Sequence, residues 1–127
     1  MQLFKAFILL LSLSFVGLSY AGEADVIEVK VKKSGEDTYQ FYVTVLHDDE
    51  GWTHYADRWD VVAPDGTVLG TRTLYHPHVG EQPFTRSLSG VTIDKAIHKV
   101  TIRAHDSVHE YGGKAVTIDL PQRNQPQ

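Results

Sequence analysis

The feature that most limits how this chain can fold is a repeated alternation of apolar and polar residues over short stretches. A period of two places every second side chain on one face of a β-strand, whereas an α-helix needs a period near 3.6. No segment sustains the helical period. Seven stretches alternate, separated by turn residues: 26–33, 38–47, a third that ends at the turn Pro64-Asp65-Gly66, 67–76, 84–93, 98–105 and 114–121.

Seven short strands at this spacing predict an all-β fold, a seven-stranded immunoglobulin-like β-sandwich. Trp59 falls on the third strand, where a core tryptophan lies in such domains. Gly90 interrupts the fifth strand, and we expect a β-bulge there. Gly112 and Gly113 stand between the last two strands, where they most simply form a hairpin turn. The predicted sandwich domain covers residues 22–120.

The first 21 residues have the composition of a secretory signal peptide. One lysine precedes the apolar stretch 6–18, and the small residues Ser19 and Ala21 stand where a signal peptidase requires them. The apolar stretch is too short to cross a bilayer, which takes about 20 residues. We therefore expect cleavage after Ala21, no membrane span, and a periplasmic or secreted protein with a disordered tail at 121–127.

Composition excludes several classes of function. The formal net charge is −4 and the basic residues are scattered, so the chain offers no positive patch for nucleic acid. The sequence has no cysteine, although disulfides are permitted in exported proteins. The fold must therefore be held by its core, and a metal site must do without thiolate. Neither a nucleophile turn around serine nor a glycine loop for phosphate is present.

Histidines gather in three of the loops that connect the expected strands. In a chain that runs up and down, every second connection lies at the same end of the sandwich, so loops 47–55, 75–83 and 105–113 share one end. Of the seven histidines, only His98 falls at the other end. Neutral imidazole is the commonest metal-binding side chain. The loops therefore predict a transition-metal site, with Cu(II) and iron favoured and Zn(II) as a further candidate.

Position within each strand and loop separates the candidate ligands. His47 has the parity of the apolar residues of its strand and Asp106 has that of its own, so both should face the core side, whereas His105 should point outward. His76 and His78 flank Pro77, which holds the backbone extended and turns both rings to one side. The predicted metal ligands are His47, His54, His76, His78, Asp106 and His109.

The acidic residues of the same loops are interpreted as solvated charges, any of which can orient a histidine ring from behind. They are Asp48, Asp49, Glu50, Glu81 and Glu110.

Two segments resemble motifs of the superoxide reductases and desulfoferrodoxins, small immunoglobulin-like domains that hold one iron with four histidines and an axial cysteine. The segments are HDDEGWTHYADRW, 47–59, and VTIRAHDSVHEYGG, 100–113; with the hairpin GTVLGT the similarity covers about 47–120. The resemblance implies His47, His54 and His109 as ligands, with Asp106 in place of the cysteine. The chain departs from the family because it lacks the thiolate and has no histidine before His47.

Three functions therefore stay open at the level of sequence. The first is an exported metal-binding protein that handles copper or iron, alone or with a periplasmic protein partner. The second is a redox enzyme of the superoxide reductase type without thiolate ligation, for which we expect slow or no superoxide reduction, because carboxylate donates less electron density than thiolate. The third is a β-sandwich interaction module whose histidine loops contact another protein without metal.

Overall fold

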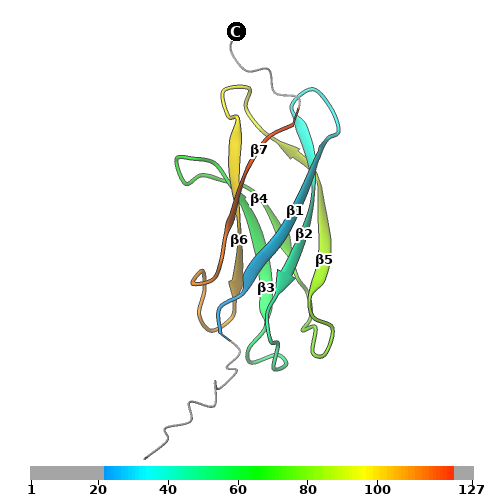
Figure 1. Ribbon diagram of the computed structural model, residues 1–127, viewed down its shortest axis with the longest axis vertical. Coiled ribbons are helices and arrows are strands. Elements are labelled where there is room, and N and C mark those ends of the chain that lie inside the picture. Colours follow the sequence, from blue (N-terminus) through cyan, green and yellow to red (C-terminus); the bar gives the residue numbers. More distant parts are fainter. Residues whose placement is uncertain (1–21, 122–127) are drawn as a thin grey trace, which may run out of the picture.

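The computed structural model describes residues 22–121, which form a β-sandwich of seven strands (Figure 1). These residues contain no helix, and so none that could cross a membrane. The predicted all-β sandwich is confirmed. The expected signal peptide at 1–21 and residues 122–127 of the expected tail lie outside the described residues. The strands are β1 (Asp25–Lys33), β2 (Thr38–Leu46), β3 (Ala56–Val62), β4 (Val68–Thr73), β5 (Phe84–Thr92), β6 (Lys99–Asp106) and β7 (Val116–Asp119).

The strands divide into a three-stranded sheet in the order β1-β2-β5 and a four-stranded sheet in the order β4-β3-β6-β7, with antiparallel neighbours. In the constant-type immunoglobulin fold the fourth strand instead pairs with the fifth. The turn between β3 and β4 accounts for the difference. Gly66 N donates to Ala63 O (2.9 Å), and Gly66 has a φ of 92° that favours glycine. A turn this short forces β4 to lie beside β3.

The core fills the space between the two sheets and follows the alternation in the sequence. Tyr39, Phe41, Val43 and Val45 of β2 are fully buried, while the residues between them are half-buried or exposed. Trp59 is also fully buried, as its position on the third strand predicts. These side chains give the sandwich its hydrophobic stabilisation.

The β-bulge expected at Gly90 is present. Tyr39 pairs with Val91 and Phe41 pairs with Leu88, so two residues of β5 stand opposite one residue of β2. Gly90 has a φ of 66°, which glycine adopts without steric cost.

The segment 22–25, which we call the N-terminal segment, lies against the connection between β6 and β7. Val26 N donates to Lys114 O (2.8 Å), and Lys114 N donates to Asp25 Oδ1 (2.7 Å). A Cβ on Gly112 would overlap the side chain of Glu23, and one on Gly113 would overlap the backbone of Ala24. The hairpin-turn role predicted for these glycines is therefore wrong, because residues 107–109 make the turn and the glycines make room for the N-terminal segment.

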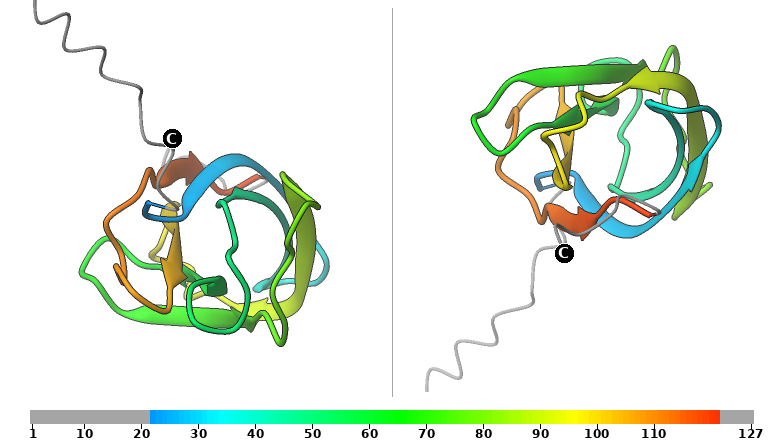
Figure 2. Two further views of the ribbon diagram at one scale, coloured as in Figure 1. Left: turned by 90° about the horizontal axis from the view of Figure 1, so that it is seen from below. Right: turned by 90° about the horizontal axis from the view of Figure 1, so that it is seen from above.

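The β2–β3, β4–β5 and β6–β7 connections meet at one end of the sandwich, the lower end in Figure 1, which Figure 2 (left) views directly. The N-terminal segment reaches the same end. His98 lies in the β5–β6 connection, where His98 O accepts a hydrogen bond from Leu120 N at the opposite end (2.8 Å). The predicted grouping of six histidines at one end is confirmed, and we call this the loop end.

Candidate metal centre

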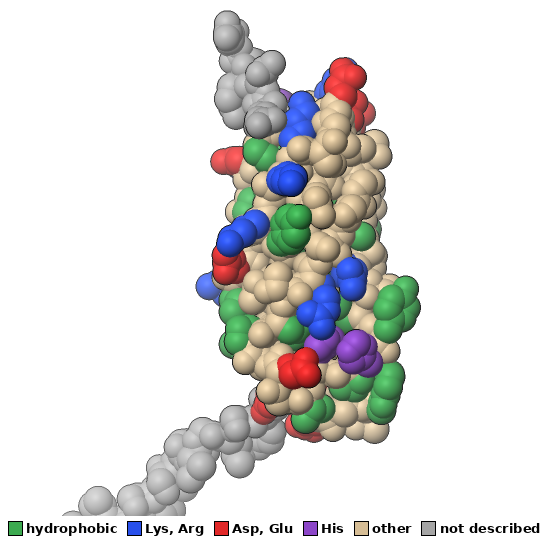
Figure 3. Space-filling model, turned by 90° about the vertical axis from the view of Figure 1, so that its right-hand side faces the viewer, with side chains coloured by type: hydrophobic (Ala, Val, Ile, Leu, Met, Phe, Trp, Pro, Cys, Tyr) green, Lys and Arg blue, Asp and Glu red, His purple; other side chains and the backbone are tan. Residues whose placement is uncertain are grey.

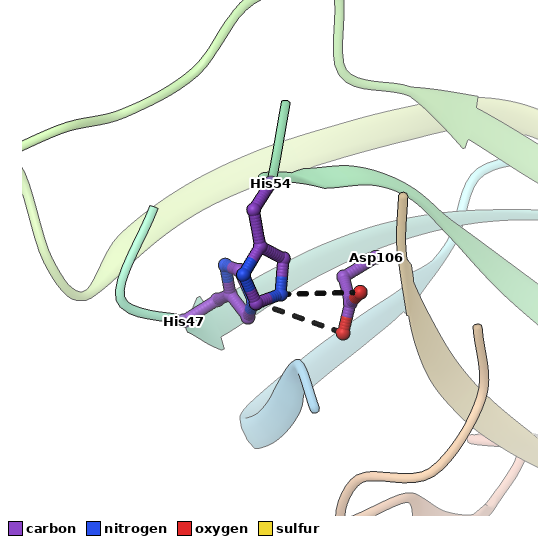
Figure 4. Close-up of side chains that lie close together, drawn as sticks. All are labelled: His47, His54 and Asp106. Atoms are coloured by element: carbon purple, nitrogen blue, oxygen red, sulfur yellow. Dashed lines mark ion pairs between the residues drawn. The ribbon is translucent and has the colours of Figure 1, made fainter. Parts of the chain in front are cut away.

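Three of the predicted ligands come together at the loop end (Figure 4). One ligand atom from each of His47, His54 and Asp106 lies within 4.8 Å of the others. The three side chains belong to residues that are only 2%, 8% and 0% exposed. His47 directly follows β2, His54 precedes β3, and Asp106 ends β6. The predicted inward orientation of His47 and Asp106 is confirmed.

His47 is held from behind by Asp49. His47 Nδ1 lies 2.5 Å from Asp49 Oδ1, while its Nε2 faces Asp106 Oδ2 at 3.7 Å. Burial lowers the pKa of His47, but the hydrogen bond and charge of Asp49, followed by the charge of Asp106, outweigh it and raise this pKa overall. A carboxylate on one ring nitrogen directs the other nitrogen toward a metal and increases its basicity.

Asp49 is itself fixed by the backbone, contrary to its interpretation as a solvated charge. It is buried, its Oδ1 also accepts from Ala56 N (3.0 Å), and its Oδ2 accepts from His78 N (2.7 Å). Burial raises the pKa of Asp49, but these hydrogen bonds, above all the one to His47, lower it below the usual value. No signal in the sequence identifies it, because the strand ends at Leu46 and the backbone turns between His47 and Asp49, where Asp49 N donates to His47 O (2.9 Å).

Asp106 presents Oδ1 to the backbone and to His54, and Oδ2 to His47 and His109. Its Oδ1 accepts from Val108 N (2.8 Å) and His109 N (2.5 Å). Burial raises the pKa of Asp106, but these two N–H groups and the neighbouring His47 and His109 lower it overall. The group is therefore an ionised carboxylate at neutral pH, which is the form that binds metal.

Two buried atoms of the centre, His54 Nε2 and Asp106 Oδ2, have no hydrogen-bond partner among residues 22–121. His54 Nε2 is 3.4 Å from Asp106 Oδ1, which is too long for a strong charged hydrogen bond. Buried polar atoms almost always have a partner, and each exception calls for an explanation. An unpartnered imidazole nitrogen and an unpartnered carboxylate oxygen in one buried group fit a transition-metal ion.

His109 lies beside the centre on its solvent side. Its Nδ1 is 3.4 Å from Asp106 Oδ2, and its ring centroid is 4.9 Å from that of His54. The side chain is 37% exposed. His109 is therefore close enough to complete the ligand set without being part of the buried group.

His76 and His78 lie at the loop end but outside the group of three. The ring of His78 stacks on Phe84 (4.0 Å between centroids), and its Nε2 accepts from Arg86 Nη2 (2.8 Å). Burial and then the charge of Arg86 lower the pKa of His78. His76 is exposed and its ring lies 4.7 Å from that of His78. Figure 3 shows histidine side chains at the surface of this end beside basic ones.

His105 lies on the other face of β6 from Asp106, as its parity predicts. Its Nδ1 is 2.5 Å from Asp57 Oδ1, and its ring packs edge-on against Tyr111 at 4.7 Å. His105 is thus buried by Tyr111 although it points away from the core. These contacts separate it from the centre.

An open pocket of about 440 Å³ adjoins the centre. Its lining includes His47 together with Gln82 and residues of the N-terminal segment, among them Gly22 and Glu23. Gln82 Oε1 accepts from His47 N (3.0 Å). The pocket therefore approaches the centre beside His47, whose side chain is itself buried.

Comparison with known proteins gives one similarity of note. A curated protein of Halomicrobium mukohataei, named "Putative lipoprotein", is 40% identical to this chain over 97 residues. The match covers 76% of this chain and 47% of the relative, so the chain spans about half the length of that protein. No family model matches the chain, and no solved structure matches it.

Proposed function

We propose that this is an exported protein that binds one transition-metal ion through His47 Nε2, His54 Nε2 and Asp106 Oδ2. The observation that carries the proposal is that His54 Nε2 and Asp106 Oδ2 are buried without a hydrogen-bond partner among residues 22–121. Without a metal, ion pairs between protonated histidines and Asp106 leave these two atoms without a good hydrogen bond. A single metal ion would bind both of them. Asp49 would support the ion indirectly by orienting His47.

The donor set selects a group of metals rather than a single one. Two imidazoles and one carboxylate with further positions open suit non-haem iron, Cu(II) and Zn(II), and copper has the highest affinity of these at equal geometry. We therefore propose Cu(II) or iron as the resident ion and Zn(II) as the third candidate. His109 is the nearest side chain that can add a fourth donor.

Export is supported by two observations of different kinds. The first 21 residues have the composition of a secretory signal peptide. The similar protein of Halomicrobium mukohataei carries the name "Putative lipoprotein", and lipoproteins are exported proteins. We propose a periplasmic or otherwise extracytoplasmic location on these grounds.

A redox enzyme related to the superoxide reductases is the second candidate. It is supported by the proximity of His47, His54, Asp106 and His109, which are the positions matched to that family's motifs. The carboxylate in place of a thiolate argues for slow superoxide reduction, because it donates less electron density to iron.

Metal analysis of the purified protein tests the proposal. We expect one ion per chain after exposure to Cu(II), Fe(II) or Zn(II), and His54→Ala should bind much more weakly because it loses a direct ligand. His98→Ala is the matched control, since His98 lies at the opposite end. Equal binding by the two variants would contradict the ligand assignment, and absence of stoichiometric metal would favour the interaction module. Rapid superoxide reduction by the iron form would favour the enzyme.

A further inference from the structure

The main-chain oxygen of Gly22 lies against the candidate metal centre. His47 Nε2 donates a hydrogen bond to Gly22 O (2.9 Å), and the same nitrogen faces Asp106 Oδ2 at 3.7 Å. This nitrogen thus stands between a backbone oxygen and a ligand carboxylate. An ion bound to this nitrogen at about 2.0–2.1 Å would take the place of the hydrogen-bonded proton, and the Gly22 carbonyl would turn aside to bind the same ion.

Packing fixes the position of Gly22. Ala24 and Val26 are fully buried, and the hydrogen bonds between 25–26 and Lys114 anchor the N-terminal segment to the β6–β7 connection. Gly113 lies so close to Ala24 that no side chain fits between them. The N-terminal segment therefore approaches the centre as part of the fold, and this approach places Gly22 beside His47.

Chain cleavage would give Gly22 a second donor. Cleavage after Ala21, which the sequence predicts, makes Gly22 the first residue and frees its α-amino group. The α-amino nitrogen and the carbonyl oxygen of one residue can bind a single ion together in a five-membered chelate ring. The amine has an ordinary pKa near 7.7–8.0, so a metal ion readily displaces its proton at neutral pH. Glycine has no side chain to hinder the approach.

We propose that Gly22, as the first residue of the mature chain, is a ligand of the metal centre through its α-amino nitrogen and its carbonyl oxygen. This proposal rests on the proposed function, because it requires the ion at His47. The resulting donors are imidazole nitrogen, amine nitrogen, carbonyl oxygen and carboxylate, a set of nitrogen and oxygen ligands that favours Cu(II). Removal of the leader and completion of the metal site are then one event.

The test compares Cu(II) binding by three forms of the protein at pH 8. The first begins at Gly22, the second begins at Ala21 and so is one residue longer, and the third begins at Gly22 with an acetylated α-amine. All three retain His47, His54 and Asp106. We expect the first form to bind Cu(II) at least about tenfold more tightly than the other two. Loss of a residue that only orients a ligand commonly weakens metal binding by this factor, and loss of a direct ligand should cost no less. Its EPR spectrum should show one more nitrogen ligand.

The outcomes separate this proposal from the proposed function. Equal affinities and identical EPR spectra for the three forms would overturn ligation by Gly22 and leave the histidine and carboxylate site intact. Absence of stoichiometric copper from all three would overturn both. The mass of the exported protein provides an independent check, because a mature chain that begins at any other residue excludes a free α-amine on Gly22.

Discussion

Replacement of Asp49 by asparagine should weaken both the fold and the metal centre. The carboxylate accepts from His47 Nδ1, Ala56 N and His78 N, and all of it is buried. Asparagine has the same shape but only one acceptor oxygen. Its NH₂ group must therefore face either His78 N or the two donors on Oδ1, which are His47 Nδ1 and Ala56 N. One buried N–H without a partner costs about 1–3 kcal/mol. Loss of charge from the remaining hydrogen bonds adds about 1 kcal/mol.

We therefore expect Asp49→Asn to lose about 2–4 kcal/mol of unfolding free energy without metal. Its metal affinity should fall about 10- to 100-fold, because His47 loses the group that orients it. Urea unfolding followed by tryptophan fluorescence measures the first quantity, and calorimetric titration measures the second.

The neighbouring Asp48→Asn is the matched control, because Asp48 is exposed and makes the same change of charge. It should leave stability and affinity nearly unchanged. If the two variants behaved alike, the hydrogen bonds of Asp49 would have no special role, and our account of how His47 is oriented would be refuted.

Three further predictions concern the centre and the N-terminal segment. Asp106→Asn should lower metal affinity at least about tenfold by calorimetry, since it removes the ionised ligand; unchanged affinity would exclude Asp106 Oδ2. The pKa of His47 is raised in the folded state, so its charged form stabilises the metal-free protein. This stabilisation is complete below the ordinary pKa of 6.5 and is lost as pH rises through the raised value. The urea midpoint should therefore fall between pH 6 and about pH 9, and it should fall less in His47→Gln. Gly113→Ala should lower the unfolding free energy by about 1–3 kcal/mol in urea, and by more than Gly112→Ala does. The Cβ added at 113 meets the backbone of Ala24, whereas the one added at 112 meets the side chain of Glu23, which can move. A larger loss for Gly112→Ala would contradict the described packing.

The fold could be predicted from the sequence because alternation reports directly on which face of a strand is buried. The same parity placed His47 and Asp106 on the core side, and the order of antiparallel strands placed the histidine loops at one end. The partner of β4 could not be read in this way, because parity says which face is buried and nothing about which neighbour a strand takes. It depended on the short turn at Gly66.

The candidate site was less predictable because burial in a loop is decided by other loops. Asp49 reads as a solvated acid in the sequence, yet it is covered and hydrogen-bonded by His47 and His78 from two different connections. His78 reads as a ligand, yet Phe84 and Arg86 of β5 hold its ring. Neither outcome follows from spacing, because each depends on side chains far apart in the chain.

The position of the centre between the two sheets bears on how this protein resists unfolding. His47 follows a strand of one sheet, and Asp106 ends a strand of the other. In antibody domains a disulfide joins the second and sixth of the seven strands, the same two that lead to these residues. A metal ion here would act as a reversible cross-link between residues 47 and 106 in a chain without cysteine, and it would stabilise the fold because it binds the folded site and not the unfolded chain. Metal supply would then control the lifetime of the fold, and chelators would affect this protein as reductants affect an antibody domain.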